Sequence, residues 1–284
     1  MKILIDIGHP AHVHYFRNFI HLMQEKGHRF MVTARNREPV PALLRHYNIP
    51  FVSRGKGGRN KPAKILYFPV AVIKQIIHAW KFKPDVFLDF STIYSGPAAF
   101  IFRKPWLTFT DTEHTRAYRF FIRPFCRWVY TPTCFQKDLG KNHFRFEGLM
   151  EMAALHPRYF EASPHVLEKL GLSEDDKFAI VRFVGETAWH DLGKKKMKPA
   201  EKVQLVRKLQ SFGKVFISTE SSLPEELRPL KLDIEPHEMH HLLSYASLVA
   251  GNGATLAAEA AVLGTPAVYI SDLRPGYLDY LEKQ

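Results

Sequence analysis

The side chains best suited to bind an anion lie in the glycine-rich run 251–264. Gly251 and Gly253 lack a Cβ, so the turn can adopt positive φ and let backbone N–H groups approach a phosphate. Thr255 adds a hydroxyl at the start of the helix that follows, where the helix dipole favours negative charge. One turn further along, Glu259 can accept hydrogen bonds from the vicinal hydroxyls of a ribose. The pattern predicts a phosphate-binding helix start, although such a turn also occurs where a helix packs closely on a sheet.

Three histidines follow the first predicted strand, in the segment Gly8-His9-Pro10-Ala11-His12-Val13-His14. The partial positive charge of a helix start disfavours imidazolium, and a neutral imidazole is what a general base requires. His12 is our candidate for this base. These residues can instead cap the helix or bind phosphate, and a metal is a further alternative for which Asp6 is the only nearby carboxylate.

Asp111 and His114 form a second candidate catalytic pair, after the strand predicted at 106–110. A carboxylate and an imidazole three residues apart can orient each other for acid–base chemistry. Alternatively, this segment only caps the next helix, with Glu113 in its first turn. The hydroxyl-rich segment 91–96 ends another predicted strand, and such loops bind sugars and cap helices equally well.

Arg182 is the candidate diphosphate ligand of the second half of the chain. It lies near the end of the strand predicted at 178–183. Its planar guanidinium can hold a diphosphate with paired hydrogen bonds, a geometry that lysine lacks. The alternative is a structural ion pair between Arg182 and Glu186 or Asp191.

Short apolar segments alternate with helical patterns along both halves of the chain. Apolar residues recur at the 3.6-residue spacing of one buried helix face over 13–26, and a second helix is predicted at 200–212. The run 55–64 is predicted as a mobile basic loop. Because the apolar runs end in Gly, Pro, Thr or Asp loops, we expect buried parallel strands with ligands at their carboxyl ends. The predicted strands are 2–7, 29–34, 51–53, 86–89, 106–110, 128–131, 178–183, 214–218, 248–250 and 265–270.

A connector is predicted near residue 160, where a proline-containing segment interrupts this alternation. It separates an N-terminal Rossmann-like lobe, 1–160, from a C-terminal Rossmann-like lobe, 161–284. Residues 1–150 carry 24 Lys and Arg against 9 Asp and Glu, whereas 151–284 carry 16 against 19. The first lobe is therefore predicted to present a basic surface, for which nucleic acid, anionic lipid or an acidic glycan would be a suitable partner.

The sequence favours a cytoplasmic protein. No segment approaches the roughly 18 uninterrupted apolar residues of a membrane span, and Asp6 interrupts the first apolar run too early for a signal peptide. Cys126 and Cys134 are too few for a disulfide framework and have no Cys–His metal spacing.

Basic and apolar residues interleave over 61–83 and 116–127. Such a surface can lie on anionic lipid at the inner face of the membrane, or belong to an ordinary amphipathic helix that covers the sheet. No nucleic-acid-binding motif accompanies the charge.

The pattern Gly-x-Gly-Ala-Thr-Leu-x-x-Glu-Ala, then Leu-Gly-Thr-Pro-Ala, resembles the nucleotide-binding signature of GT-B glycosyltransferases and the related UDP-N-acetylglucosamine 2-epimerases. Within this superfamily the whole chain is most similar to the prokaryotic family called domain of unknown function 354. The resemblance implies two doubly wound α/β lobes that face a cleft, with the acceptor on the first lobe and the sugar nucleotide on the second. GT-B chains usually continue further and return a C-terminal helix to the first lobe, so it also implies either truncation at Gln284 or a small second lobe.

The resemblance also implies roles for single residues. It puts Arg182 and His190 beside the phosphates and His237 against the base. The residues expected to hold the nucleoside diphosphate are Arg182, His190, His237, Gly251, Gly253, Ala254, Thr255 and Glu259.

The expected activity is glycosyl transfer from a nucleoside-diphosphate sugar, with UDP favoured, to a glycan or a lipid-linked acceptor that a histidine of the first lobe activates. The helix start and Arg182 can stabilise the leaving diphosphate, so neither a metal nor a further cofactor is expected. A UDP-N-acetylglucosamine 2-epimerase is the first alternative, with Asp111, Glu113 and His114 as the acid–base set near sugar C2. A non-catalytic glycan- or nucleotide-binding protein is the second.

Overall fold

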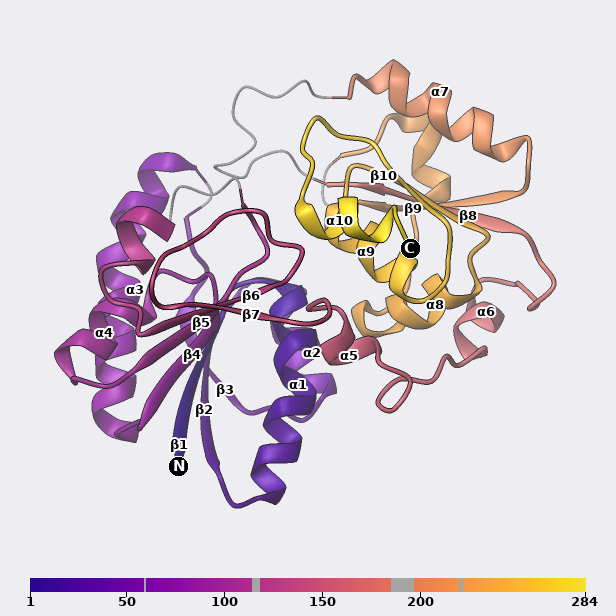
Figure 1. The fold of residues 1–284 in the computed structure, drawn as a ribbon. Coiled ribbons are helices and arrows are strands. Elements are labelled where there is room, and N and C mark those ends of the chain that lie inside the picture. The colour runs from indigo at the N-terminus through magenta and orange to yellow at the C-terminus, as the bar shows by residue number, and fades with distance from the viewer. Residues whose placement is uncertain (59, 114–117, 185–196, 220–221) are drawn as a thin grey trace. The chain divides into compact units, whose positions relative to one another are not determined.

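The chain divides into two compact units in a computed structural model that describes residues 1–58, 60–113, 118–184, 197–219 and 222–284. Unit 1 comprises Met1–Ala154 and unit 2 comprises Leu155–Gln284 (Figure 1). The division falls a few residues before the predicted connector at 160. Each unit is built on a parallel sheet, which confirms the predicted α/β class.

Unit 1 alternates strands and helices from its first residues. The described strands are β1 (Lys2–Ile7), β2 (Arg29–Arg35), β3 (Phe51–Gly55), β4 (Val86–Phe90), β5 (Trp106–Phe109), β6 (Trp128–Pro132) and β7 (His143–Phe146). The described helices are α1 (Pro10–Glu25), α2 (Val40–His46), α3 (Lys61–Phe82), α4 (Ser95–Ile101), the π-helix η1 (Tyr118–Ile122) and α5 (Met152–Leu155), which crosses the division. Among the described residues the strands form one sheet in the order β3-β2-β1-β4-β5-β6-β7.

Alternation along β1 determines which helices cover each face of this sheet. Ile3, Ile5 and Ile7 pack in one core with residues of α1 and α2. Leu4 points to the other face, where it packs with Ala79 of α3 and with residues of α4. Figure 1 shows these two pairs of helices on opposite sides of the sheet. The sheet is therefore buried on both faces, as expected for parallel strands.

Unit 2 contains a smaller sheet with the same winding. Its described strands are β8 (Phe178–Phe183), β9 (Lys214–Thr219), β10 (Leu248–Gly251) and β11 (Ala267–Tyr269). Its described helices are α6 (His165–Lys169), α7 (Pro199–Gln210), η3 (Glu225–Leu230), η4 (Pro236–Glu238), α8 (Met239–Tyr245), α9 (Ala254–Val262) and α10 (Gly276–Leu281). The strand order is β11-β10-β8-β9 within the described part.

The last strand of unit 2 departs from the sequence prediction. A buried strand was expected at 265–270, but β11 has only three residues and Val268 is 51% exposed. The reason is its place at the edge of the sheet, where one side lacks a neighbouring strand.

The strand order reverses direction once in each sheet. In unit 1 the reversal lies between β1 and β4, and in unit 2 it lies between β8 and β10. At such a point the loops after the two strands diverge and leave a crevice in which open α/β sheets bind their ligands. In unit 1 the histidine-rich segment follows β1, and in unit 2 the glycine turn follows β10.

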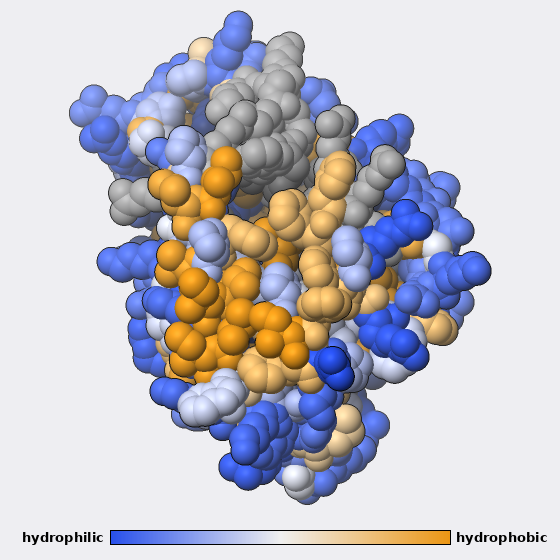
Figure 2. All heavy atoms as spheres, turned by 90° about the vertical axis from the view of Figure 1, so that its left-hand side faces the viewer, coloured by the Kyte–Doolittle hydropathy of each residue, from blue (hydrophilic) through white to orange (hydrophobic). Residues whose placement is uncertain are grey.

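Helix α3 is apolar on both its inner and its outer side. Asn60 caps it by accepting a hydrogen bond from Ala63 N at 3.0 Å, so the loop predicted over 55–64 ends earlier than expected. Ala71 and Ala79 are fully buried, whereas Leu66 and Trp80 are exposed. Figure 2 shows apolar side chains gathered on this face of the molecule. Within the described residues, no helix combines the length and the apolar composition needed to cross a bilayer.

The close contact of α4 with β5 depends on Gly96. A Cβ at this position would lie 2.6 Å from Trp106 Cζ3, so we expect Gly96→Ala to lower the free energy of unfolding by about 1–3 kcal/mol. Helix propensity alone would have the opposite effect, because alanine in place of glycine within a helix raises the free energy of unfolding by about 1 kcal/mol. The measurement is chemical denaturation, with Gly8→Ala as the control because its Cβ would have no neighbour closer than 3.6 Å. A stabilised Gly96→Ala variant would contradict this packing.

Candidate functional site

A buried charge cluster lies at the carboxyl end of the unit 1 sheet. Arg54 on β3 donates from Nε to Asp6 Oδ1 on β1 at 2.7 Å, and both side chains are almost fully buried. Thr33 donates to the same carboxylate oxygen at 2.8 Å. The Arg54 guanidinium lies over the ring of Tyr94 at 4.2 Å, and the Tyr67 hydroxyl donates to the Arg54 carbonyl at 2.8 Å. Asp6 and Tyr94 thus fix the Arg54 guanidinium beside the end of β1, while Thr33 holds the carboxylate and Tyr67 the Arg54 main chain.

His12 lies next to this cluster in the first turn of α1. Its Nδ1 accepts a hydrogen bond from Gly8 N at 3.4 Å, and its ring lies 5.1 Å from that of Phe90. His9 is the N-cap of α1 and accepts a hydrogen bond from Ala11 N at 3.3 Å. Helix capping was the alternative role that the sequence offered for these histidines. Part of the His12 ring stays exposed, yet desolvation by burial, then the nearby His9 and Arg54, lower its pKa well below 6.5. His12 is therefore neutral at pH 7, as a general base must be.

Asp89 is a second carboxylate inside the sheet, directly beside Asp6 in the pairing of β1 with β4. It accepts hydrogen bonds from Thr108 Oγ1 at 2.6 Å, Thr92 Oγ1 at 2.8 Å and Trp106 Nε1 at 2.9 Å. Burial raises the pKa of Asp89 to about 7, and the negative charge of Asp6 acts in the same direction. The carboxyl group thus changes its charge near neutral pH.

Asp111 follows β5 at the same end of the sheet. Its side chain is buried and accepts a hydrogen bond from Thr112 Oγ1 at 2.9 Å. Burial raises its pKa to about 6, with the neighbouring Glu113 acting in the same direction. His114, the predicted partner of Asp111, lies outside the described residues, so their pairing stays a prediction.

The glycine turn of unit 2 lies in contact with the end of β8. Gly251 has a φ of +137°, and a Cβ there would lie 2.0 Å from the Arg182 carbonyl oxygen. A Cβ at Gly253 would lie 2.6 Å from Arg182 Cγ. Asn252 joins the two strands further, since its N–H donates to the Arg182 carbonyl at 3.1 Å and its Oδ1 accepts from Val184 N at 2.8 Å. Only glycine fits at 251 and 253, and the turn places the start of α9 beside Arg182.

The side chain of Arg182 lies at the carboxyl end of the sheet, where its Nη1 donates to Ser218 Oγ on β9 at 2.8 Å. Gly253 is the N-cap of α9, and Ala254 and Thr255 form the first turn. The alternative ion pairs of Arg182 with Glu186 or Asp191 involve residues outside the described part of the chain, as does the predicted ligand His190.

Glu259 lies one turn into α9 and is buried. Its Oε1 lies 3.2 Å from His240 Nε2 of α8, which is also buried. His237, the histidine that the resemblance selected, is half-buried in η4. The structure thus pairs Glu259 with a histidine that the sequence analysis did not select, three residues after the predicted one.

Asp89 and Arg54, which the sequence analysis did not select, share one signal with Asp6, which it named only for the metal alternative. Asp6 and Asp89 interrupt otherwise apolar strands, Ile-Asp-Ile and Leu-Asp-Phe, and Arg54 interrupts β3. A charged side chain within a buried parallel strand requires a partner. Such a residue can therefore be chosen from the sequence as a candidate site residue. The identity of the partner came only from the fold.

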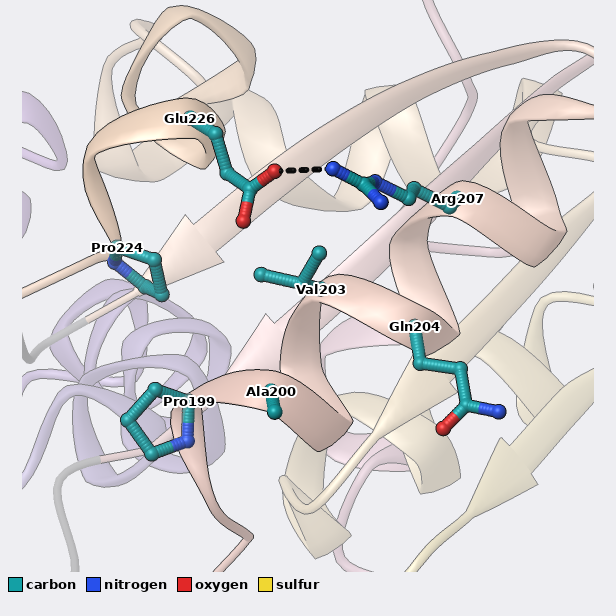
Figure 3. A pocket seen from close by; sticks show the side chains of 7 residues that line it. All are labelled: Pro199, Ala200, Val203, Gln204, Arg207, Pro224 and Glu226. Atoms are coloured by element: carbon teal, nitrogen blue, oxygen red, sulfur yellow. Dashed lines mark hydrogen bonds and ion pairs between the residues drawn. The ribbon is translucent and has the colours of Figure 1, made fainter.

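A shallow pocket in unit 2 lies away from the glycine turn. Figure 3 shows it between α7 and η3, with an ion pair between Arg207 and Glu226 at 2.7 Å across its edge. It contains none of the predicted site residues. Within the described ranges, no three His, Cys, Asp or Glu side chains gather closely enough to hold a metal ion.

A family model described as "Protein of unknown function (DUF354)" matches residues 1–279. The chain belongs to this family. It is also similar to the uncharacterized protein MJ0665 of Methanocaldococcus jannaschii, with 25% identity over 279 residues that cover 94% of this chain and 81% of the relative.

Two solved structures illustrate the fold. The UDP-GlcNAc 2-epimerase of Neisseria meningitidis, bound to UDP-GlcNAc, superposes with a TM-score of 0.75 at 14% identity, over 99% of this chain and 85% of that one. The spinosyn rhamnosyltransferase SpnG superposes with a TM-score of 0.56 at 12% identity, over 95% and 80%. At these identities the likeness concerns the fold, which is the GT-B type that the sequence predicts.

The raised pKa of Asp89 makes stability depend on pH. Between the ordinary value of 3.8 and about 7 the folded protein binds a proton that the unfolded chain releases, so this carboxyl lowers the free energy of unfolding as pH rises through that range. Asp89→Asn keeps a neutral acceptor for Trp106 and Thr92, and its amide can donate to Thr108. We expect the variant to gain stability relative to wild type from pH 4 to pH 8, by up to about 4 kcal/mol.

The measurement is denaturant unfolding of both proteins at several pH values. A difference between variant and wild type that stays constant from pH 4 to 8 would show that Asp89 is ionised throughout.

Proposed function

We propose that this protein is a nucleoside-diphosphate-sugar-dependent enzyme, with a UDP-sugar as the favoured substrate, and that it transfers the sugar to an acceptor hydroxyl. The observation that carries the proposal is the juxtaposition of Arg182 with the turn at the start of α9, whose residues 251 and 253 have no side chain. Two structures similar in fold are described as bound to UDP-GlcNAc, and other similar structures are a rhamnosyltransferase and a further glycosyltransferase.

The unit 2 residues suit a diphosphate. The first N–H groups of α9 have no acceptor within the helix, and the dipole of the helix adds partial positive charge at the same end. Arg182 supplies a full positive charge and a fork that matches two phosphate oxygens. Together they would stabilise the negative charge that develops on the leaving diphosphate. Glu259, oriented by His240, supports the expected contact with the ribose hydroxyls.

The unit 1 residues suit proton transfer. A neutral His12 would accept the proton of the acceptor hydroxyl while the new bond forms between the acceptor oxygen and the anomeric carbon. The bond between that carbon and the diphosphate breaks, and the nucleoside diphosphate leaves with the bonding electrons. No redox partner is needed for this exchange.

A 2-epimerase is the second candidate, because Asp111 lies at the carboxyl end of the unit 1 sheet, where burial raises its pKa to about 6. A carboxyl group with this pKa is suited to gain and lose a proton during removal of a C–H proton and its return. The UDP-GlcNAc 2-epimerases are also the structures with the higher TM-scores.

The diphosphate site is tested with Arg182→Lys, which keeps the positive charge and the aliphatic part of the side chain but loses the paired N–H donors of the guanidinium. We expect this variant to bind UDP about tenfold or more weakly than wild type. Isothermal titration calorimetry measures the affinity, and Arg207→Lys, at an exposed arginine of the same unit, is the matched control. Equal affinity of wild type and Arg182→Lys would rule out bidentate binding by Arg182.

The base is tested with His12→Asn. We expect a loss of turnover of about 10²–10⁴-fold with unchanged UDP affinity, because a base acts in the transition state and not in nucleotide binding. His21→Asn changes an exposed histidine of the same helix and should leave turnover intact. In wild type the rate should fall only below pH 6.5, since the pKa of His12 is lowered.

Product analysis separates the two candidates. UDP release that requires an added glycan or lipid-linked acceptor supports transfer, whereas conversion of UDP-GlcNAc without any acceptor supports the epimerase.

A further inference from the structure

We infer that the outer face of α3, α4 and η1 is a docking surface for an anionic lipid bilayer. This inference goes beyond the proposed function and does not depend on it. It rests on an apolar face that stays exposed among the described elements, joined to exposed cations.

The apolar face begins with the outward stripe of α3. Exposed residues recur at the spacing of one helix face, while the opposite positions Ala71, Gln75 and Ala79 are fully buried. Ala71 and Ala79 thus lie on the buried side of α3, and five large apolar side chains point outward. The exposed stripe consists of Leu66, Val70, Ile73, Ile77 and Trp80, with exposed fractions of 73%, 48%, 56%, 45% and 66%.

Two neighbouring segments extend this stripe into a broader patch. Phe100 and Ile101 at the end of α4 are 69% and 56% exposed, and Phe120 of η1 is 64% exposed. Ring contacts join the segments, because Phe68 of α3 lies 5.6 Å from Phe121 and Phe100 lies 5.8 Å from Phe125. Figure 2 shows the continuous orange surface on this side. Clustered apolar patches of this kind mark interaction sites, unlike apolar residues that are scattered singly.

The charge of these segments is of one sign. The sequence contains no Asp or Glu at 39–84, 90–110 or 114–137. Exposed cations lie in the same segments or directly after them: Lys81, Lys83, Arg103, Lys104, Arg123 and Arg127. Apolar side chains that enter the acyl region, combined with cations at the headgroup level, are the features of a surface that binds anionic lipid. An exposed Trp suits the interfacial depth.

A second copy of the chain is the less suitable occupant. In a two-fold dimer the same patch meets itself, so two sets of these cations would be brought together, with Asp85 beside Lys104 as the carboxylate at its edge. A bilayer that contains phosphatidylglycerol instead supplies the compensating negative charge.

The test is co-sedimentation of the full chain with vesicles. We expect binding to phosphatidylcholine vesicles containing about one third phosphatidylglycerol, weak binding to phosphatidylcholine alone, and loss of binding when salt rises from about 0.1 M to about 1 M. The triple variant Leu66→Ser/Ile73→Ser/Trp80→Ser should bind at least about tenfold more weakly. Lys81→Gln/Lys104→Gln/Arg123→Gln should weaken binding and reduce its salt dependence.

The control is Phe212→Ser/Val268→Ser, which removes two exposed apolar side chains from unit 2 and should bind as wild type does. Thermal unfolding checks that each variant is folded, and light scattering reports its mass. The inference is overturned if wild type does not bind the anionic vesicles, or if neither triple variant binds more weakly. It is also overturned if the serine variant converts a wild-type dimer to a monomer without changing vesicle binding.

Discussion

The close approach of the Gly251 backbone to the Arg182 carbonyl is the constraint on which the candidate site of unit 2 depends. Any side chain at 251 would overlap that carbonyl, since its Cβ would lie 2.0 Å from the oxygen. The pairing of β8 with β10 brings the two residues opposite each other, and the chain then turns directly into α9. The Arg182 guanidinium, the start of α9 and a turn with glycine at 251 and 253 are thereby fixed in one place by backbone geometry.

Unit 1 stabilises its polar groups differently, by burying them in pairs and networks. The Asp6–Arg54 ion pair lies inside the sheet, where desolvation of two charges offsets much of their attraction. A sheet of this kind would be stable with apolar residues at both positions. The charges at the reversal of the strand order, beside a neutral His12, are the basis on which we propose a chemical role for this site. The same reasoning applies to Asp89, whose carboxyl is held by three donors.

Much of the fold could be predicted from the sequence, because strand patterns depend on neighbouring residues. The strands predicted at 2–7 and 178–183 have the bounds of β1 and β8, and the helix predicted at 200–212 overlaps most of α7. The prediction that the strand at 265–270 is buried was wrong, because an edge position is a property of the sheet and not of the segment. Fold type and family followed from the glycine pattern, and both are confirmed.

The candidate sites were predictable only where one segment contains the whole signal. The glycine turn and its helix are contiguous, and so is the segment that contains His12. Arg54 and Asp6 are 48 residues apart, and His240 contacts Glu259 from another helix. Neither pair can therefore be predicted from a local spacing of residues. The roles of Arg182, Glu259, His237, His12 and Asp111 stay predictions.

The proposed function requires the turn at 251–255 to hold a diphosphate. Hydrogen–deuterium exchange of the protein with saturating UDP, compared with uridine, is the sharpest test, because the two ligands differ only in the diphosphate. We expect UDP to slow amide exchange at 253–256, at the start of α9, and uridine to leave it unchanged. If UDP binds but exchange at 253–256 stays unchanged, or if the protected amides all lie in unit 1, the turn does not hold the diphosphate.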